Sequence, residues 1–307
     1  MFRTALMIVL AAAAACAEYR VVHGWPVLPE GFALGQVTGV GLDSQNHVWV
    51  FHRGDSPVLC FDAETGKLLA SWGDGLFPMT HGLTVDGRDN IWLTDVERHQ
   101  VFKYNTRGEL LMTLGVKGVP GADRAHFNKP TDVAVTRGGE FYVTDGYGNS
   151  RVVKFSADGK YLAEWGTKGA GPGQFDIPHS ITIDPDGLVY VADRGNARIQ
   201  VFDGAGKFLR QFSGKAIGRP WGITVAPNGF LYMVDGGDAK PKPPERNRAL
   251  KLDRQGRVIE SWGSFGSYDG QFYWAHDIAV APNGDAYVVD VNVGMRVQKF
   301  KQENIRK

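Results

Sequence analysis

The stretch "PHSITIDPDGLVYVADRGNARIQVF", residues 178–202, decides the fold because it holds three short strands and the turns that join them. Ser180 to Asp184 is a short apolar strand, and the sequence Asp-Pro-Asp-Gly at its end predicts a turn. An aromatic-rich strand follows and ends at Asp193, and a third strand follows the next loop. His179 stands at the start of the first strand, directly after a proline, so it is either a spacer or a ligand.

The same unit recurs six times along the chain. Each copy has a short apolar strand, a turn that ends in Gly or Asn, an aromatic-rich strand and a third strand. The copies begin at Thr38, His81, Thr131, His179, Trp221 and His276. A spacing of about 42 to 55 residues, with four strands per copy, is typical of the blades of a β-propeller. The sequence therefore predicts an all-β, six-bladed β-propeller.

The sixth copy is incomplete, and the N-terminal part of the chain can complete it. This copy ends after "MRVQKFK", without a fourth strand. The segment "YRVVHGW", Tyr19 to Trp25, resembles the end of a repeat, so we expect it to supply the missing strand and close the ring. Helical periodicity is essentially absent, which excludes Rossmann and α/β-barrel folds.

Three of the six first residues are histidines, and they lie in alternate blades. The innermost strand of each blade lines the channel, and its start lies on the same rim as the end of the second strand. Alternate blades of a six-bladed ring are related by about 120°, so His81, His179 and His276 should converge on the axis. Three neutral imidazoles with an open coordination position form a catalytic metal site. Histidines placed by chance are the alternative, but strict alternation favours a metal.

The loops after the second strands carry further candidate residues. Blade 1 has His52 and then Arg53 where the other blades have Asp, and this departure predicts a functional role for Arg53. Tyr147 lies between two glycines, and Arg194 follows the second strand of blade 4. An arginine here suits a carboxylate, and a tyrosine near a cation can act as a base. Alternatively, Arg194 only pairs with neighbouring carboxylates. The recurring aspartates are expected to cap turns, and they are Asp95, Asp145, Asp193, Asp235 and Asp290.

Composition and the N-terminus bear on location and partners. The 34 basic and 33 acidic residues balance, so long-range electrostatics do not favour a nucleic acid or an anionic membrane. Residues 1–17 predict a secretory signal peptide, and residues 18–307 the propeller of an exported, periplasmic or secreted protein. Alternatively, Cys16 is lipidated, which would anchor the protein to a membrane. Cys60 has no disulfide partner in the mature chain and is expected to be a buried strand residue.

These motifs resemble two known families. The runs "GAGPGQF", "GSYDGQF", "DGYGNSRVVKF" and "DRGNARIQVF" resemble NHL repeats. Across residues 36–303, the motifs "FHRGD", "HGLTVD", "HFNKPTDVAV", "YVTDGYGNSR", "PHSI", "VADRGNARIQVF" and "HDIAV" resemble, in that order, peptidyl-α-hydroxyglycine α-amidating lyase. That enzyme is the lyase half of the peptide-amidating enzyme. The resemblance covers nearly the whole mature chain, and it implies a propeller lyase that cleaves peptidyl-α-hydroxyglycine into a peptide amide and glyoxylate.

The resemblance also implies roles for individual residues. The implied ligands of a catalytic zinc ion are His81, His179 and His276. The implied catalytic residues are Arg53, Tyr147 and Arg194. A structural calcium ion in the channel is implied to bind Asp277 and the backbone carbonyls of Val40 and Leu83. Three histidines suit iron or copper as well as zinc, so the identity of the metal stays open.

The chain departs from this family in two ways. The family usually pairs a cysteine in "HFC" with one in "GYC", and here those positions are Asn128 and Gly148. We therefore expect Tyr147 to be held by packing and hydrogen bonds alone. The printed sequence contains no copper monooxygenase domain, so we expect a separate enzyme to make the hydroxyglycine, or the native substrate to differ.

Three alternatives to the lyase would each require different residues. A non-catalytic exported NHL propeller that binds a protein or a glycan on its rim has no need of three axial histidines. A calcium-dependent lactonase would use carboxylate and asparagine ligands at the axis, and RNA binding would need a basic face. The lyase requires a small peptide or an N-acyl hydroxyglycine as its substrate, and metal analysis separates it from a binding module.

Overall fold

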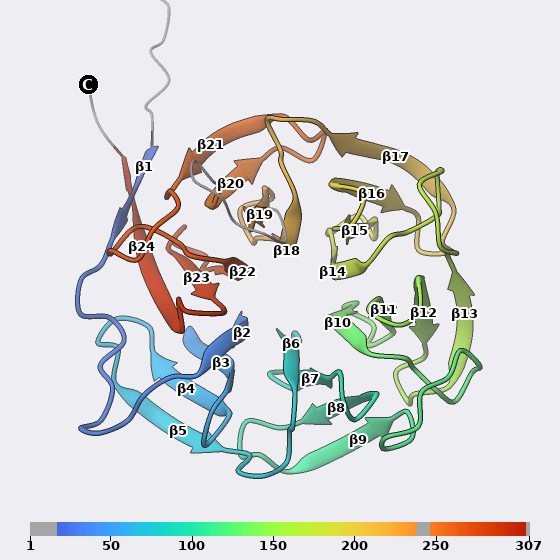
Figure 1. Cartoon of the computed structure of the whole chain (residues 1–307), viewed down its shortest axis with the longest axis horizontal. Helices are drawn as coiled ribbons and strands as arrows, with labels where there is room; N and C mark the ends of the chain where they lie inside the picture. The colour runs from blue at the N-terminus through green and yellow to red at the C-terminus, as the bar shows by residue number, and fades with distance from the viewer. Residues whose placement is uncertain (1–16, 238–245, 305–307) are drawn as a thin grey trace, which may run out of the picture.

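The described residues form a ring of six blades around a central axis (Figure 1). The structure is a computed structural model and describes residues 17–237 and 246–304. Each blade is a sheet of four antiparallel strands. The six-bladed propeller predicted from the repeats is confirmed. Cys16 and nearly all of the expected signal peptide lie outside the described residues, so both stay predictions.

The blades repeat one strand order from the axis outward (Figure 1). The innermost strands are β2 (Gln36–Leu42), β6 (Thr80–Val85), β10 (Pro130–Val135), β14 (Pro178–Ile183), β18 (Pro220–Val225) and β22 (Ala275–Val280). The second strands are β3 (His47–Arg53), β7 (Ile91–Asp95), β11 (Phe141–Asp145), β15 (Val189–Asp193), β19 (Leu231–Asp235) and β23 (Ala286–Asp290). The third strands are β4 (Val58–Asp62), β8 (Gln100–Tyr104), β12 (Arg151–Phe155), β16 (Arg198–Phe202), β20 (Arg248–Leu252) and β24 (Arg296–Asn304). The outermost strands are β5 (Leu68–Trp72), β9 (Leu110–Leu114), β13 (Tyr161–Trp165), β17 (Phe208–Ser213), β21 (Val258–Trp262) and, in blade 6, β1 (Ala17–Val21).

The burial of each strand follows its distance from the axis. All five residues of β15 are buried, because neighbouring blades cover both faces of a second strand. Along the outermost strand β13, half-buried and exposed residues alternate. The apolar runs of the second and third strands therefore fill six clusters of buried residues between the sheets. Cys60 is buried on β4, as expected. Within the described residues, no helix is long and apolar enough to cross a membrane.

The Asp-Pro-Asp-Gly turn joins β14 and β15 as the sequence predicts. The backbone N–H of Asp184 donates to the carbonyl of Leu188 at 3.0 Å, and the N–H of Gly187 donates to the carbonyl of Asp184 at 2.9 Å. The Asp184 carboxylate accepts the N–H groups of Asp186 and Leu188. Gly187 has a φ of 83°, which glycine adopts without the steric cost of a side chain. The turn sends the chain back toward the rim that carries the histidines.

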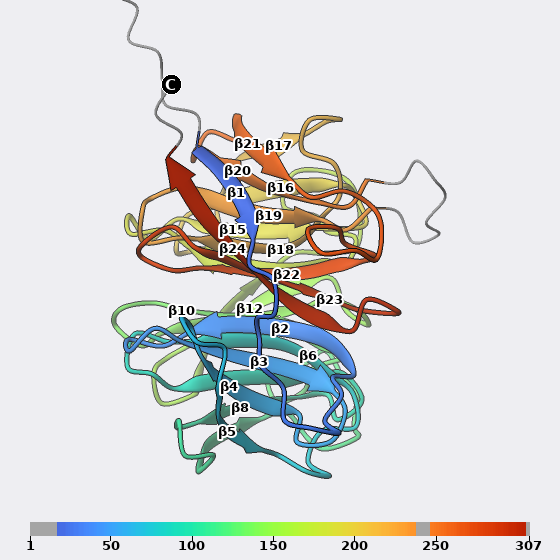
Figure 2. The same cartoon turned by 90° about the vertical axis from the view of Figure 1, so that its left-hand side faces the viewer.

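The N-terminal strand closes the ring, as the sequence predicts. All five residues of β1 pair antiparallel with β24, and the two strands lie side by side in Figure 2. The predicted bounds were wrong, because the strand ends at Val21 and not at Trp25. The chain turns at Gly24, which has a φ of 73°. Trp25 lies beyond this turn and packs against the ring of Tyr287, with their centroids 5.0 Å apart.

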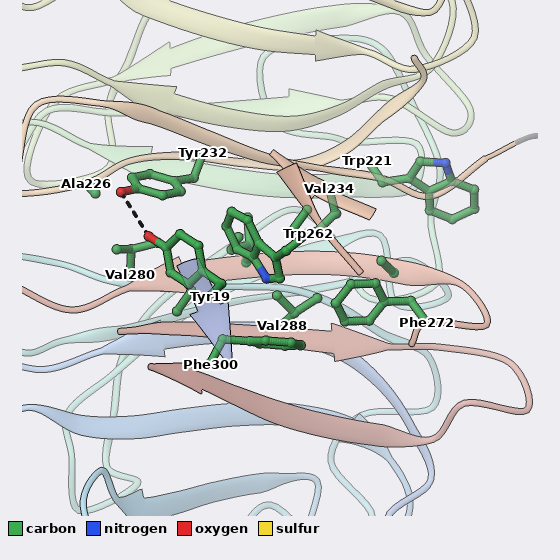
Figure 3. Packing of buried hydrophobic residues seen from close by; sticks show 14 residues of the cluster. Tyr19, Trp221, Ala226, Tyr232, Val234, Trp262, Phe272, Val280, Val288 and Phe300 are labelled. Carbon is green, nitrogen blue, oxygen red and sulfur yellow. Dashed lines mark hydrogen bonds between the residues drawn. The ribbon is translucent and has the colours of Figure 1, made fainter. Parts of the chain in front are cut away.

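Tyr19 anchors the closing strand in the core between blades 5 and 6 (Figure 3). Its ring stacks on Trp262 with a centroid distance of 3.8 Å. Its hydroxyl lies 3.3 Å from the hydroxyl of Tyr232 and 3.2 Å from the carbonyl of Gly284. Tyr19 is only 7% exposed, so nearly all of its side chain packs against the protein. The closure therefore depends on one well-packed aromatic side chain as well as on backbone pairing.

Replacing this side chain should destabilise the fold strongly. We expect Tyr19→Ala to lower the free energy of unfolding by about 3–5 kcal/mol, the usual cost of removing a buried aromatic ring. The matched control is Arg20→Ala on the same strand, whose side chain is 59% exposed and pairs with exposed glutamates. We expect the control to change the free energy by less than about 0.5 kcal/mol. Urea unfolding of both variants measures this, and equal losses would contradict the packing role.

Candidate active site

Each first residue of a copy sits at a β-bulge in the innermost strand of its blade. In blade 4, Pro178 pairs with Asp193 and Ser180 pairs with Ala192, so His179 is left unpaired between them. The innermost strands of the other five blades break register at the corresponding position. A bulge changes the direction of a side chain. These bulges let the bulged side chain face the axis, a feature that the repeat alignment did not reveal.

The three histidine rings meet on the axis, as the sequence predicts. His81, His179 and His276 are between 1% and 3% exposed. The three distances between their ring centroids are 4.7, 4.8 and 4.9 Å, so the rings form a nearly equilateral triangle. The ring nitrogens lie close enough together that this group could hold a metal ion.

A backbone carbonyl of the next blade orients each histidine. The donor and acceptor residues are His81 with Thr131 (2.7 Å), His179 with Trp221 (3.0 Å) and His276 with Thr38 (2.7 Å). A carbonyl can only accept, so each Nδ1 carries the proton and each Nε2 keeps a lone pair. The three carbonyls belong to the first residues of blades 1, 3 and 5. The odd blades therefore orient the histidines that the even blades supply, which accounts for their alternation around the ring.

Burial keeps these imidazoles uncharged. It lowers the pKa of His81 to about 3 and the pKa values of His179 and His276 well below the ordinary value. The positive charge of Arg194 lowers all three pKa values further, and that of Arg53 lowers the pKa values of His81 and His276. Neutral imidazole is the form that binds a metal ion.

Tyr147 lies over the histidines, in the loop after β11. Its hydroxyl is 3.0 Å from Nε2 of His81 and 3.2 Å from Nε2 of His179. Each nitrogen needs a donor, but the hydroxyl has one proton and can satisfy only one of them. Among the described residues, no donor is within hydrogen-bond distance of Nε2 of His276. A cation would satisfy all three lone pairs, so the donor set fits a divalent metal ion.

Arg194 holds Tyr147 from the side of blade 4. Its guanidinium Nη1 donates to the Tyr147 hydroxyl at 3.1 Å. Its Cζ lies 5.1 Å from the centroid of the Tyr147 ring and 4.3 Å from that of the Trp221 ring. Between residues 17 and 237 and between 246 and 304, no carboxylate forms an ion pair with Arg194. The alternative of pairing with neighbouring carboxylates therefore finds no support in the described residues.

Arg53 approaches the same point from blade 1. Its Nη1 donates to the side-chain oxygen of Gln36 at 2.7 Å, and its Nε lies 3.3 Å from the carbonyl of Thr80. His52 replaces the repeated aspartate here and accepts the N–H of Gly35 at 3.0 Å. Sequence reasoning missed Gln36, whose only signal is its position two residues before the first residue of its copy.

These groups line one cavity of about 740 Å³ at the mouth of the ring. Its lining includes Arg53, Tyr147, Arg194 and His276. Burial lowers the pKa of Arg53, and a guanidinium group in a protein keeps its charge at neutral pH. The cavity can therefore bind an anionic group beside a metal ion and a phenol.

The recurring aspartates are groups of the fold, as expected. Asp193 is fully buried, and it accepts the backbone N–H of Asp176 and the Nε of Arg198, both at 2.7 Å. Asp95 is also fully buried and accepts the N–H of Met79 at 2.9 Å. These bonds fix the backbone just before each innermost strand, and hence the direction of the bulged residue.

A second polar centre lies below the histidines. Asp132 and Asp277 each follow the first residue of a copy, in opposite blades, and both line a cavity of about 350 Å³ together with Val40 and Leu83. Burial raises the pKa of Asp132 to about 6, and burial and the Asp132 charge raise the pKa of Asp277 well above its ordinary value. The N–H of Val40 donates to Asp277 at 3.1 Å. A cation would relieve this repulsion. Sequence reasoning missed Asp132, although it occupies the same repeat position as Asp277.

Asn128 and Gly148, which take the place of the family's cysteines, are in contact. The N–H of Gly148 donates to the carbonyl of Asn128 at 2.9 Å. A Cβ added at Gly148 would come within 2.4 Å of the Asn128 amide, so a larger residue cannot be accommodated without a shift. Hydrogen bonds therefore hold the Tyr147 loop, as expected from the loss of both cysteines.

Part of the chain matches a repeat family. Residues 127–155, 175–202 and 272–300 match the NHL repeat. They span the first three strands of blades 3, 4 and 6.

Curated proteins match a larger part of the chain. Peptidyl-α-hydroxyglycine α-amidating lyase 2 of Drosophila melanogaster is 32% identical over 318 residues, 91% of this chain and 74% of that protein. Lyase 1 of the same organism is 34% identical over 94% of this chain and 61% of that protein. Peptidyl-glycine α-amidating monooxygenase A of Xenopus laevis is 38% identical over 90% of this chain. The aligned parts cover only 22% to 32% of the amidating monooxygenases that the chain matches.

Solved structures support the fold alone. A gluconolactonase from Xanthomonas campestris superposes with a TM-score of 0.65 at 16% identity, over 93% of this chain and 90% of that one. Streptogramin B lyase superposes with a TM-score of 0.62 at 14% identity, over 94% of this chain and 98% of that one. At these identities the likeness extends to the propeller and not to its chemistry.

Proposed function

The chain belongs to the family of the peptidyl-α-hydroxyglycine α-amidating lyases, and we propose that it cleaves N-acyl-α-hydroxyglycines, including peptides that end in α-hydroxyglycine, into an amide and glyoxylate. One observation carries this proposal. Tyr147, Arg53, Arg194 and His276 line one cavity, and the Tyr147 hydroxyl lies 3.0 Å from Nε2 of His81 and 3.2 Å from Nε2 of His179. These side chains can reach the carboxylate, the hydroxyl group and the C–N bond of a substrate bound in the cavity.

Two side chains act directly on the substrate in this proposal. Arg53 binds the substrate carboxylate, because its guanidinium is held by Gln36 and faces the cavity. The Tyr147 oxygen, in its phenolate form, takes the proton of the substrate hydroxyl. Arg194 donates to that oxygen and stabilises its negative charge before the proton arrives.

The bond changes balance without another reactant. As the hydroxyl proton leaves, the C–O bond becomes the carbonyl of glyoxylate and the C–N bond breaks. The electron pair of the C–N bond goes to the nitrogen, which then needs a proton. Tyr147 carries the proton it has just accepted and can return it, so the amide and glyoxylate leave and the phenolate is restored.

The histidines are the proposed ligands of a divalent metal ion. Zinc suits three neutral imidazoles with an open position, and iron or copper are alternatives. The ion would supply Lewis-acid polarisation of a substrate oxygen. The three Nδ1 bonds to backbone carbonyls keep the Nε2 atoms directed at the axis, so His81, His179 and His276 are preorganised for this role.

Glyoxylate release tests the proposed function. We expect the purified protein, supplied with zinc, to release glyoxylate from α-hydroxyhippurate. This activity should be lost after dialysis against a chelator and should return when metal is added back. Elemental analysis of the same samples should give about one ion per chain at the histidine site. Metal-loaded protein that releases no glyoxylate would contradict the proposal. Protein that takes up no metal would favour the non-catalytic binding module.

A calcium ion is the proposed occupant of the lower centre, with Asp132 as a ligand beside Asp277. At about 100 times its dissociation constant, Ca²⁺ should stabilise the fold by about 2.7 kcal/mol. We expect Asp132→Asn to lose most of this calcium-dependent stabilisation, because the site loses one of its two charges. Thermal unfolding with and without Ca²⁺ measures it. The matched control is Asp158→Asn in an exposed turn, and an equal response in both variants would remove Asp132 from the site.

The origin of the substrate and the location of the protein are also proposals. A separate monooxygenase is the proposed source of the hydroxyglycine. Export through the signal peptide of residues 1–17 would bring the enzyme to peptides outside the cytoplasm. Retention at the membrane would depend on lipidation of Cys16.

A further inference from the structure

The cavity above the histidines is larger than the reacting group needs, and its two sides differ. The α-hydroxyglycine end of a substrate contributes a carboxylate, a hydroxyl and two carbons, which fill a small part of about 740 Å³. Gln36, Arg53 and Tyr147 form one side. The other side carries Arg194, Arg219 and Asn292 as well as four apolar residues, which we name the apolar wall: Ile177, Trp221, Trp274 and Val291.

The repeat explains why these side chains are neighbours. The residue two positions before the first residue of each copy lies at the cavity end of the ring, and these residues are Gln36, Met79, Lys129, Ile177, Arg219 and Trp274. Ile177 and Trp274 belong to blades 4 and 6, on either side of Trp221 in blade 5. Arg219 in blade 5 donates to the carbonyls of Arg194 and Gly195. Three successive blades thus contribute to one apolar surface.

Hydrogen bonds and ring contacts make the apolar wall rigid. The backbone N–H of Trp274 donates to the buried carboxylate of Asp290, and its carbonyl accepts the N–H of Val291 at 3.0 Å. The Trp274 ring lies 5.3 Å from the Trp221 ring at an angle of 54°. Trp221 in turn lies 5.6 Å from the His276 ring. The wall therefore begins at the proposed metal centre and is preformed for a ligand.

Ile177 keeps an unfavourable backbone conformation on this wall. Its φ of 58° is in the left-handed region, where β-branched residues are rare. The loop requires it, because the Ile177 carbonyl accepts the N–H of Arg194 at 3.1 Å, and Lys129 has a φ of 63° at the same position of blade 3. Glycine would adopt this conformation without strain. An isoleucine here points to a use for its side chain, which lines the cavity.

We propose that the apolar wall is the subsite for the acyl side of the substrate and selects an apolar, preferably aromatic, group there. This inference rests on the proposed function. With the carboxylate at Arg53 in blade 1, the amide nitrogen and its acyl group extend toward blades 4 to 6. A planar group can pack against the Trp274 ring, next to the Trp221 ring that Arg194 covers, and burial of its apolar surface favours binding. For a peptide, the group is the penultimate residue.

Paired substrates test the subsite. We expect the wild-type protein to cleave N-benzoyl-α-hydroxyglycine, which is α-hydroxyhippurate, with a kcat/KM about tenfold or more above that of N-acetyl-α-hydroxyglycine. Trp274→Ala should lower kcat/KM for the benzoyl substrate about tenfold, mainly through KM, and leave the acetyl substrate within about twofold. Trp274→Phe should restore most of the preference, because it keeps an aromatic ring. An unchanged ratio of the two substrates in Trp274→Ala would overturn the proposal.

Ile177→Gly separates a role in binding from a role in stability. Removing the strain should leave the melting temperature unchanged or raise it. Loss of the side chain should nevertheless lower the preference for the benzoyl substrate about fivefold. A lower melting temperature with an unchanged preference would mean that Ile177 only packs within the fold, and would count against the subsite.

Calorimetric binding distinguishes failure of the subsite from failure of the proposed function. Both substrates are titrated into metal-loaded wild-type protein and into Trp274→Ala. Tighter binding of the benzoyl compound that depends on Trp274, without glyoxylate release, would keep the subsite and overturn the lyase. Glyoxylate release with equal binding of both compounds would keep the lyase and overturn the subsite.

Discussion

His179→Ala should abolish glyoxylate release and remove the metal from the protein. The variant loses one of the three proposed ligands, and the remaining two imidazoles cannot complete the proposed metal site. Lewis-acid polarisation is worth several kcal/mol, and about 1.4 kcal/mol corresponds to a factor of ten, so the expected loss in kcat is roughly a thousandfold. Glyoxylate assay and elemental analysis of the same preparation measure both effects.

A second histidine variant serves as the control. His23 is exposed and pairs with Asp269, so His23→Ala should keep full activity and full metal content. The release of glyoxylate at the wild-type rate by His179→Ala would remove the histidines from the reaction. Circular dichroism of the variant must match the wild type, because His179 also donates to the buried carbonyl of Trp221.

Tyr147→Phe should lower kcat about 10²- to 10⁴-fold while the metal content stays unchanged, because a general base contributes this much. The ring that packs beside Arg194 remains, and only the hydroxyl is lost. KM should change little, since Arg53, the proposed carboxylate ligand, is still present. Steady-state kinetics with α-hydroxyhippurate and elemental analysis distinguish this variant from His179→Ala, which should lose both activity and metal.

The matched control for this variant is Tyr268→Phe. Tyr268 is 82% exposed and lies outside the cavity, so removal of its hydroxyl should not change kcat. If Tyr147→Phe kept the wild-type kcat, another group or a water molecule would have to accept the hydroxyl proton. If it lost the metal, Tyr147 would belong to the ligand set instead.

The ring and its alternate histidines could be predicted because they depend on repetition. Six copies of one unit determine which residues are equivalent, and equivalent residues of a closed ring must lie at equal distances from the axis. These equivalences do not depend on any side-chain conformation. The repeat groups His81, His179 and His276 together, and Arg53 departs from its pattern.

Several features of the site could not be predicted because they depend on contacts between blades. The bulge at each first residue has no marker in the sequence, since it follows from register within a sheet. Gln36 and Asp132 become relevant only when the blades bring them beside Arg53 and Asp277. The closing strand was predicted too far along the sequence. It lies at Ala17–Val21 because β24 is longer than the other third strands, and the closing strand pairs with the C-terminal part of β24.

The bond from His276 to the carbonyl of Thr38 crosses the seam where the first and last blades meet. The two residues are 238 positions apart, so this imidazole is oriented only after the whole chain has been made and the ring has closed. Uptake of the proposed metal ion would therefore report on completed folding. A truncated or partly folded chain would lack the complete histidine triangle. It would therefore neither bind the metal ion nor release glyoxylate, so only the closed ring would be active.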